Sequence, residues 1–232
     1  MGLFSKKEAC PICGGKVGFL LPTKIDGTAI CSDCSGKIDV PKDVLKGFTL
    51  DSFQDYLSFY DENQGLKGTF RASETIDFGV LDTKFVFDYN NKLFCMSKKL
   101  DKTIFEGSQI TGFSIKEDDT LLYKYEDGEL TEGTSAVRQA ITMMSPILDM
   151  IRRQNRDNDN DDFRRNNDIK EPFKQFVLEL YLDHPYWYNI TADMDAPNFN
   201  DTRPDANDYL REYDKDIEVM KKLCDAFKRI AE

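Results

Sequence analysis

Two pairs of cysteines near the start of the chain constrain its fold more than any other feature. Cys10 and Cys13 flank a Pro-Ile pair, Cys31 and Cys34 flank a Ser-Asp pair, and 17 residues separate the two motifs. Each Cys-x-x-Cys turn aims two thiolates at one point. Two such turns together build the tetrahedral four-sulfur shell that structural zinc prefers. We therefore predict one structural Zn²⁺ bound by these four cysteines; a redox-active dithiol pair and another soft metal are the alternatives.

The predicted site is structural because its sulfurs fill all four positions and leave none for a catalytic water. About forty residues bury too little apolar surface to fold alone, so this module depends on its metal. Gly14 and Gly15 follow the first motif, where a positive φ is often needed. Inside the module the residues predict a strand over 16–21 and a hairpin turn at Asp26-Gly27.

The run Cys-Pro-Ile-Cys-Gly-Gly-Lys-Val-Gly that starts at Cys10 resembles the opening of a bacterial zinc-ribbon family of uncharacterised function. The resemblance covers residues 10–36, and residues 184–187 and 208–213 look like the tails of full-length relatives. It implies a short zinc ribbon followed by a variable β-rich region. It implies no activity.

The charge of the chain bears on its partners. The sequence holds 31 basic and 42 acidic residues, a net charge of −11. Such a surface repels phosphates and anionic lipids over about a Debye length, roughly 8 Å in physiological salt. Membrane and nucleic-acid partners are therefore disfavoured. The sequence shows no secretory signal and no apolar run of about 18 residues, and its cysteines read as thiols or metal ligands, so we expect a cytoplasmic protein.

The middle of the chain changes from helical to strand periodicity. Apolar residues at helical spacing predict a helix over 50–63 that docks its aromatic face on a neighbouring domain. A hairpin at Tyr89-Asn90-Asn91 is expected to place its asparagines at positive φ. Closely spaced apolar runs predict six short strands, over 69–76, 84–88, 92–96, 103–105, 110–115 and 120–125.

Helical and charged segments interrupt the strands before the chain ends. A helix that begins near Ser135 should be kinked or interrupted by Pro146. Residues 152–168 are almost wholly charged or amide and predict a loop. Two further strands are expected over 173–182 and 186–194, and a long amphipathic helix from about Pro204.

These elements predict an α+β fold. We expect a zinc ribbon over 1–40, a helical linker over 41–66 and an antiparallel β-barrel or sandwich over 67–232. The order of the elements fits a pleckstrin-homology-like domain, with a helical and charged insertion at about 130–170 and a C-terminal helix over 204–231. A generic α+β domain is the main competitor.

The other candidate sites have simpler structural readings. His184, the single histidine, is interpreted as a turn or edge residue, and Trp187 as core. Asp157, Asp159 and Asp161 have the spacing of a calcium loop without its glycine and final glutamate, so we expect a solvated loop. Asp193 and Asp195 are expected in a turn after the last strand, not at a magnesium ion. Cys95 and Cys224 are expected to be buried hydrophobes.

The sequence thus shows no catalytic constellation, and we expect a non-enzymatic zinc-binding interaction or adaptor protein with a protein or peptide partner. The alternative is a nucleic-acid-associated regulator that binds through the zinc ribbon. It rests on a local excess of lysines, which include Lys16 and Lys24. Four thiolates on one Zn²⁺ offset most of that charge.

Overall fold

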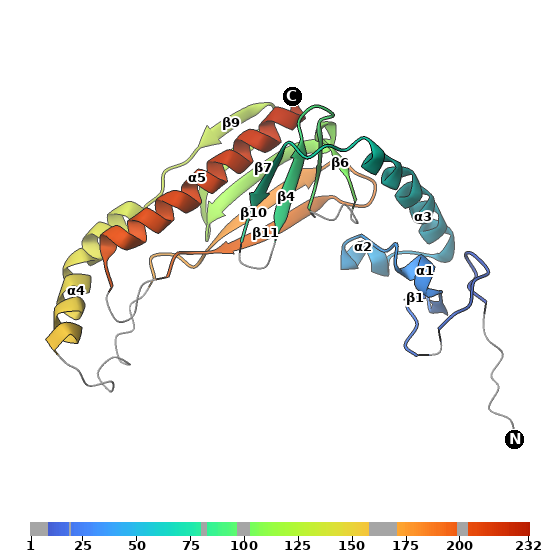
Figure 1. Ribbon diagram of the computed structural model, residues 1–232, viewed down its shortest axis with the longest axis horizontal. Coiled ribbons are helices and arrows are strands. Elements are labelled where there is room, and N and C mark those ends of the chain that lie inside the picture. Colours follow the sequence, from blue (N-terminus) through green and yellow to red (C-terminus); the bar gives the residue numbers. More distant parts are fainter. Residues whose placement is uncertain (1–8, 19, 80–82, 97–102, 158–170, 199–203) are drawn as a thin grey trace, which may run out of the picture.

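The computed structural model describes residues 9–18, 20–79, 83–96, 103–157, 171–198 and 204–232. Figure 1 shows an arch: the N-terminal module lies at one end, two sheets lie in the middle, and a helix lies at the other end. A long C-terminal helix runs along the sheets. The chain is therefore a mixed α+β protein with antiparallel sheets and a C-terminal helix, as the sequence predicted.

The N-terminal module contains one short hairpin. β1 (Lys24–Ile25) pairs with β2 (Thr28–Ala29). The turn between them places Asp26 at φ 48° and Gly27 at φ 76°, which confirms the predicted turn. The predicted strand over 16–21 is wrong. In the described part of this segment only Lys16 pairs, through a single bridge to Ala9, and the left-handed backbone of Leu21 (φ 44°) turns the chain away.

Three helices complete the module: α1 (Ser32–Ser35), α2 (Lys42–Lys46) and α3 (Leu50–Gln64). The helix predicted over 50–63 is thus confirmed. Thr49 caps α3 in a reciprocal arrangement, because its hydroxyl accepts from the Ser52 amide while the Ser52 hydroxyl accepts from the Thr49 amide. A 3₁₀ turn, η1 (Gly65–Gly68), follows α3 and leads into the sheets.

Two antiparallel sheets follow. The first has the strand order β3-β4-β5-β6 and the second β11-β10-β7-β8-β9, with the 3₁₀ turn η2 (Gly107–Gln109) between β6 and β7. The strands of the first sheet are β3 (Glu74–Asp77), β4 (Lys84–Asp88), β5 (Leu93–Cys95) and β6 (Phe105–Glu106). Those of the second are β7 (Ile110–Glu117), β8 (Thr120–Glu126), β9 (Glu129–Glu132), β10 (Gln175–Leu182) and β11 (Asn189–Asp195).

The C-terminal helix α5 (Ala206–Ala231) joins the two sheets into one core. The Phe227 ring lies 5.2 Å from the Phe87 ring of the first sheet and 5.6 Å from the Phe113 ring of the second. Near the end of α5, Gly107 is needed because a Cβ there would lie 2.0 Å from the Ile230 carbonyl oxygen. The helix starts two residues later than predicted, since the Asp205 carboxylate caps it by accepting from two backbone amides.

The remaining helix, α4 (Val137–Asp157), packs against α5. Arg138 forms an ion pair with Asp214 of α5, and Arg152 with Asp205 at its start. Pro146 does not interrupt α4, which is continuous over 21 residues. It also takes in the first part of the loop predicted over 152–168; the rest, including Asp159 and Asp161, lies outside the described residues.

Two expectations about the sheets are corrected, and one strand was missed. Of the predicted barrel or sandwich, a closed barrel is not formed, because no strand ladder joins the two sheets within the described residues. β9 was not predicted, although the turn before it places Asp127 and Gly128 at positive φ. In the hairpin after β4 the residue at positive φ is Lys92, not an asparagine, because the Asp88 carboxylate accepts from both asparagine amides and holds them in a right-handed turn.

The pleckstrin-homology-like assignment and the boundaries at residues 40 and 66 stay predictions. The strands predicted over 69–76 and 103–105 occur later, at β3 and β6. Asp193 and Asp195 lie within β11 and not in a turn after it. Their carboxylates belong to an edge strand, where charged side chains discourage pairing with another chain.

Candidate metal centre

The structure brings the four predicted cysteine ligands together. Their sulfur atoms all lie within 4.8 Å of one another, with Cys10 Sγ 3.9 Å from Cys34 Sγ and Cys13 Sγ 3.4 Å from Cys31 Sγ. A tetrahedral shell with metal–sulfur bonds of about 2.3 Å needs sulfurs about 3.8 Å apart. The cluster could therefore hold one metal ion. In the part of the chain that the structure describes, no other group of three His, Cys, Asp or Glu residues has this arrangement.

Local backbone structure fixes the first cysteine pair. The Cys10 amide donates to the Gly15 carbonyl at 2.7 Å, and the Gly14 amide returns a bond to the Cys10 carbonyl at 2.8 Å. Gly14 takes a φ of 71°, which L-residues rarely adopt. A Cβ on Gly15 would lie 3.2 Å from Cys13 Sγ. Gly14 thus has the positive φ that the sequence suggested for this turn, whereas Gly15 does not, and a side chain there would crowd the Cys13 sulfur.

The second pair lies at the start of a helix. Cys31 caps α1 and its Sγ accepts from the Cys34 amide at 3.5 Å, just as Cys13 Sγ accepts from the Gly15 amide at 3.4 Å. An amide aimed at a sulfur stabilises the thiolate form. Each motif therefore supplies its own amide donor to one of its two sulfurs, which suits anionic ligands.

The surroundings of the sulfurs affect the ionisation of Cys10 and Cys34 in opposite directions. Burial raises the pKa of Cys10, but hydrogen bonds from the Cys13, Cys31 and Ile12 backbones outweigh it and bring that pKa down to about 6. Burial and the neighbouring thiols raise the pKa of Cys34 well above its ordinary value. A divalent cation bonded to all four sulfurs would remove the conflict by releasing the remaining protons. The donor set thus fits a soft, four-coordinate metal such as zinc.

The metal ligands share one core with the neighbouring helices. Cys10, Cys31 and Cys34 are buried together with the aromatic face of α3, which includes Phe53 and Tyr56. The ring of Phe48 stacks on Tyr56 at 5.5 Å. The segment that the sequence treated as a linker therefore contributes four of the ten buried side chains in the core that surrounds the metal centre.

The other candidate residues lie apart from this centre. His184 is 4% exposed in the turn between β10 and β11, where its Nδ1 accepts from the Tyr186 and Trp187 amides. Burial lowers its pKa to about 4, so it is neutral at physiological pH. Cys95 and Cys224 are fully buried, as predicted. Trp187 is only partly buried, and it bonds to the N-terminal module.

Comparison with known proteins covers the same region. Residues 8–56 match a family described as a domain of unknown function (DUF4428). The match begins just before Cys10 and ends within α3, so it includes the four cysteines, α1, α2 and the Phe53 and Tyr56 side chains. It fits an N-terminal metal-binding module that extends into the aromatic helix. No curated protein and no solved structure matches the chain.

Sequence reasoning missed two features of the module. Leu20 and Leu21, placed in a predicted strand, are 83% and 98% exposed. The apolar run that ends at Pro22 offered a signal, because proline can donate to no ladder. Asp39 was also missed, and it accepts hydrogen bonds from the sheet region. None of the helices in the described ranges has the length and apolar character needed to cross a membrane.

Proposed function

We propose that this chain is a non-enzymatic zinc-binding interaction protein whose N-terminal module presents a surface to a protein or peptide partner. One observation carries the proposal: a closed four-sulfur centre supports a module that projects two leucines into solvent. Leu20 and Leu21 are the most exposed of the large hydrophobic side chains that the structure describes. A centre with four protein ligands stabilises a fold and offers no position for catalysis.

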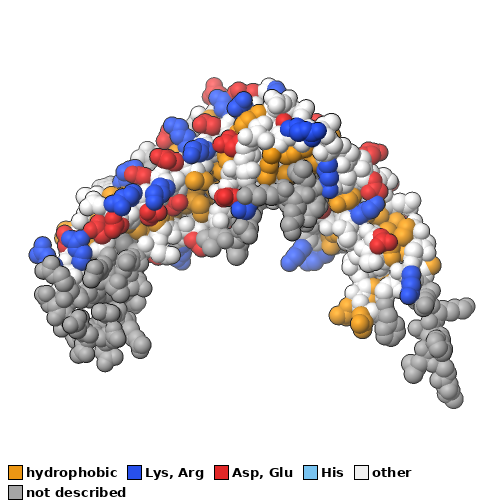
Figure 2. All heavy atoms as spheres, viewed as in Figure 1, with side chains coloured by type: hydrophobic (Ala, Val, Ile, Leu, Met, Phe, Trp, Pro, Cys, Tyr) orange, Lys and Arg blue, Asp and Glu red, His pale blue; other side chains and the backbone are white. Residues whose placement is uncertain are grey.

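The two exposed leucines are consecutive residues, and both side chains are available for contact. Burying a leucine side chain contributes about 1.5–3 kcal/mol, so two leucines supply a useful share of a moderate affinity. Figure 2 shows hydrophobic side chains, in orange, exposed at the lower edge of the module. Leu21 takes its exposed position with a left-handed backbone (φ 44°), a conformation that costs a leucine about 1 kcal/mol or more. Such strain at an exposed apolar residue favours a recognition role.

The finer assignments belong to the same proposal. Zinc is the proposed metal, in a ribbon-type module, because a closed shell of four cysteines is typical of structural zinc. A cytoplasmic location suits four ligands that must stay reduced. Two antiparallel sheets and a packed C-terminal helix support a pleckstrin-homology-like region, which would offer a second surface, for example by strand addition at a sheet edge.

The test compares two variants of the full chain in its native cell, one with both leucines of the module changed and one with a leucine elsewhere changed. The variant with Leu20→Ser and Leu21→Ser should lose the captured protein partner, whereas Leu121→Ser, a change of a partly exposed leucine on β8, should retain it. Both should keep one equivalent of zinc. Equal capture by both variants would rule out the leucine surface.

The same experiment separates the nucleic-acid alternative. Lys16 and Lys24 are exposed in the same module as the leucines. Phosphate contacts would make the captured material nuclease-sensitive, and its affinity would fall linearly with salt on a log–log scale. A captured protein that survives nuclease and moderate salt supports the interaction role instead.

A further inference from the structure

The N-terminal module is held against the sheet region by the residues that directly follow its last cysteine. The Tyr56 hydroxyl of α3 donates to the Lys37 carbonyl at 2.7 Å and accepts from the Asp39 amide at 2.8 Å. Lys37 is itself bonded through its amide to the Cys34 carbonyl. The position of Asp39 is therefore set by a zinc-ligand turn on one side and by α3 on the other.

Asp39 in turn bonds to two distant parts of the sheet region. Its Oδ2 accepts from the Thr103 amide at 2.6 Å and from the Thr103 hydroxyl at 2.8 Å, just before β6. Its backbone carbonyl accepts from Trp187 Nε1 at 3.1 Å. Thr103 is 2% exposed, so its two bonds to Asp39 are largely shielded from water and costly to lose.

An aromatic contact runs beside these hydrogen bonds. Tyr186, in the turn between β10 and β11, places its ring 5.1 Å from the Tyr56 ring and 5.1 Å from the Phe59 ring. Tyr186 packs on the same buried cluster that contains Cys10, Cys31 and Cys34. The three buried cysteines and the Tyr186 ring thus pack in one cluster.

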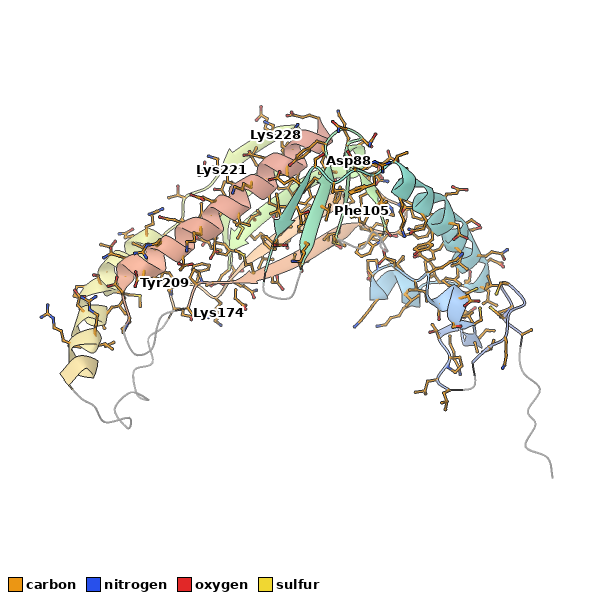
Figure 3. All side chains as sticks on the ribbon, in the orientation of Figure 1. Asp88, Phe105, Lys174, Tyr209, Lys221 and Lys228 are labelled. Carbon is orange, nitrogen blue, oxygen red and sulfur yellow. The ribbon has the colours of Figure 1, made fainter. Side chains whose placement is uncertain are left out.

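The turn that carries Tyr186 is shaped by His184. The two amides that donate to His184 Nδ1, at 3.1 and 3.0 Å, are those of Tyr186 and Trp187 themselves. Its buried Nε2 has no hydrogen-bond partner among the described residues. Phe105, labelled in Figure 3 near α3, meets the Trp187 ring edge-on at 5.8 Å. The turn therefore presents the Tyr186 ring and the Trp187 Nε1–H to the module, while the His184 Nε2 is left unsatisfied within the described part of the chain.

A second contact holds the other end of α3 without involving the metal core. Asn63 Nδ2 donates to the Ile104 carbonyl at 2.7 Å, and Asn63 Oδ1 accepts from the Ile104 amide at 2.9 Å. These two bonds between the Asn63 amide group and the Ile104 backbone resemble the paired hydrogen bonds between neighbouring strands. The C-terminal end of α3 is thus fastened to the sheet region, while its first two turns depend on the module.

We infer that zinc at the four cysteines acts as a lock that holds the module in one orientation on the sheet region. With the metal bound, the Asp39 bonds and the Tyr186 contact are formed. Loss of the metal disorders the ligand turns and removes the surface on which residues 37–39 and Tyr186 pack. The module then swings about the Asn63 anchor, and Trp187 becomes exposed. The sheets stay folded, because the α5 side chains that join them, among them Phe227, belong to a separate core.

The lock goes beyond the proposed interaction role and depends only on metal binding. It makes the direction of the Leu20–Leu21 surface relative to the sheets depend on the metal. A partner that contacts both parts of the chain would then bind only the zinc-loaded form.

Trp187 is the only tryptophan and reports on the lock directly. Zinc is removed from the full chain with a chelator, and emission and amide hydrogen exchange are followed. We expect a shift to longer wavelength and at least tenfold faster exchange at Thr103, Tyr186 and Trp187, whereas the Ile104 amide, which donates to Asn63, should keep its protection. The β7 and β10 amides should keep their protection, and added zinc should restore both signals. Unchanged exchange at Thr103, Tyr186 and Trp187 in zinc-free protein would overturn the inference, as would equal loss of protection in β7 and β10.

Reciprocity gives an independent test. If zinc fixes the junction, the junction must strengthen zinc binding by the same factor. Tyr186→Ala should weaken zinc affinity by about tenfold, measured by competition with a chromophoric chelator. Tyr188→Ala is the matched control, because Tyr188 lies in the same turn but is 61% exposed. Equal affinities for the two variants, with β7 and β10 still protected, would show that the metal and the junction are uncoupled.

Discussion

The two ends of this chain build their cores by different means. The N-terminal module has a small buried cluster in which three of the ten fully buried members are metal-ligand cysteines. The sheet region has a core of aromatic and aliphatic side chains from both sheets and two helices. A short chain buries a smaller fraction of its surface than a long one. The module therefore lacks the apolar area for independent stability, whereas the sheet region has enough. The folding of the module should therefore depend on the metal, and the stability of the sheet region should depend on how completely its side chains fill the core.

The largest expected effect comes from removing the metal ligands. With Cys10→Ser and Cys31→Ser together, we expect less than half an equivalent of zinc and complete loss of exchange protection in β1, β2 and the first half of α3. Structural zinc contributes about 10–16 kcal/mol in zinc-finger peptides, far more than this small core can replace. Zinc content and hydrogen exchange measure the outcome.

Cys224→Ala is the control for that experiment. Cys224 is buried in α5, so the variant should keep one equivalent of zinc. Full zinc content in the double variant would show that other residues hold the metal.

The converse change creates a cavity in the sheet region. Phe227 packs edge-on against Phe85 and Phe94, as well as contacting Phe87 and Phe113. Phe227→Ala should lower the free energy of unfolding by about 3–5 kcal/mol in urea titrations, because the rings cannot collapse fully into the space. Zinc content should not change. The neighbouring Lys228→Ala should cost less than about 0.5 kcal/mol, and a similar loss in both variants would contradict the packing described here.

Features of the fold that depend on residues close together in the sequence could be predicted, and features that depend on distant residues could not. The cysteine spacing and the α3 and α5 stripes are local patterns, and the metal centre and both helices were predicted. β9 has an exposed, acidic composition that gives no strand signal, although its Asp-Gly turn gives one. The bond between Trp187 and Asp39 joins residues 148 positions apart, and no local pattern encodes it.

The sequence left open whether the sheets close into a barrel or stay a sandwich, for a related reason. Strand spacing indicates antiparallel neighbours but not whether the last strand returns to the first. Here the chain passes through α4 and then adds β10 beside β7, so the second sheet grows outward. α5 covers both sheets, and its residues close the core that a barrel would have closed with strands.

A single hydroxyl tests whether the two cores are joined. Tyr56→Phe keeps the ring stack with Phe48 but removes the partner of the Lys37 carbonyl and the Asp39 amide. We expect a loss of about 1–3 kcal/mol of stability in the zinc-loaded chain, since two shielded groups lose their bonds. The loss should be seen in thermal unfolding followed at Trp187. The exposed Tyr188→Phe serves as the control and should be neutral.

The smallest effect is a pH dependence at the turn between the two parts. The folded-state pKa of His184, lowered by burial to about 4, lies below the ordinary value of 6.5. Between these values the unfolded chain binds a proton that the folded chain does not. Stability contributed by neutral His184 is therefore complete above pH 6.5 and falls as the pH drops, by about 1.4 kcal/mol per unit.

An asparagine variant isolates this contribution from the carboxylates that also titrate in acid. In His184→Asn the side-chain oxygen can accept from the Tyr186 and Trp187 amides, so the turn is kept without a titrating group. Urea unfolding at pH 7.0 and 5.5 should show a smaller drop in stability for His184→Asn than for the natural chain, by about 1 kcal/mol. Equal drops would mean that His184 takes up its proton in the folded state, and that the turn opens to water while the two cores stay folded.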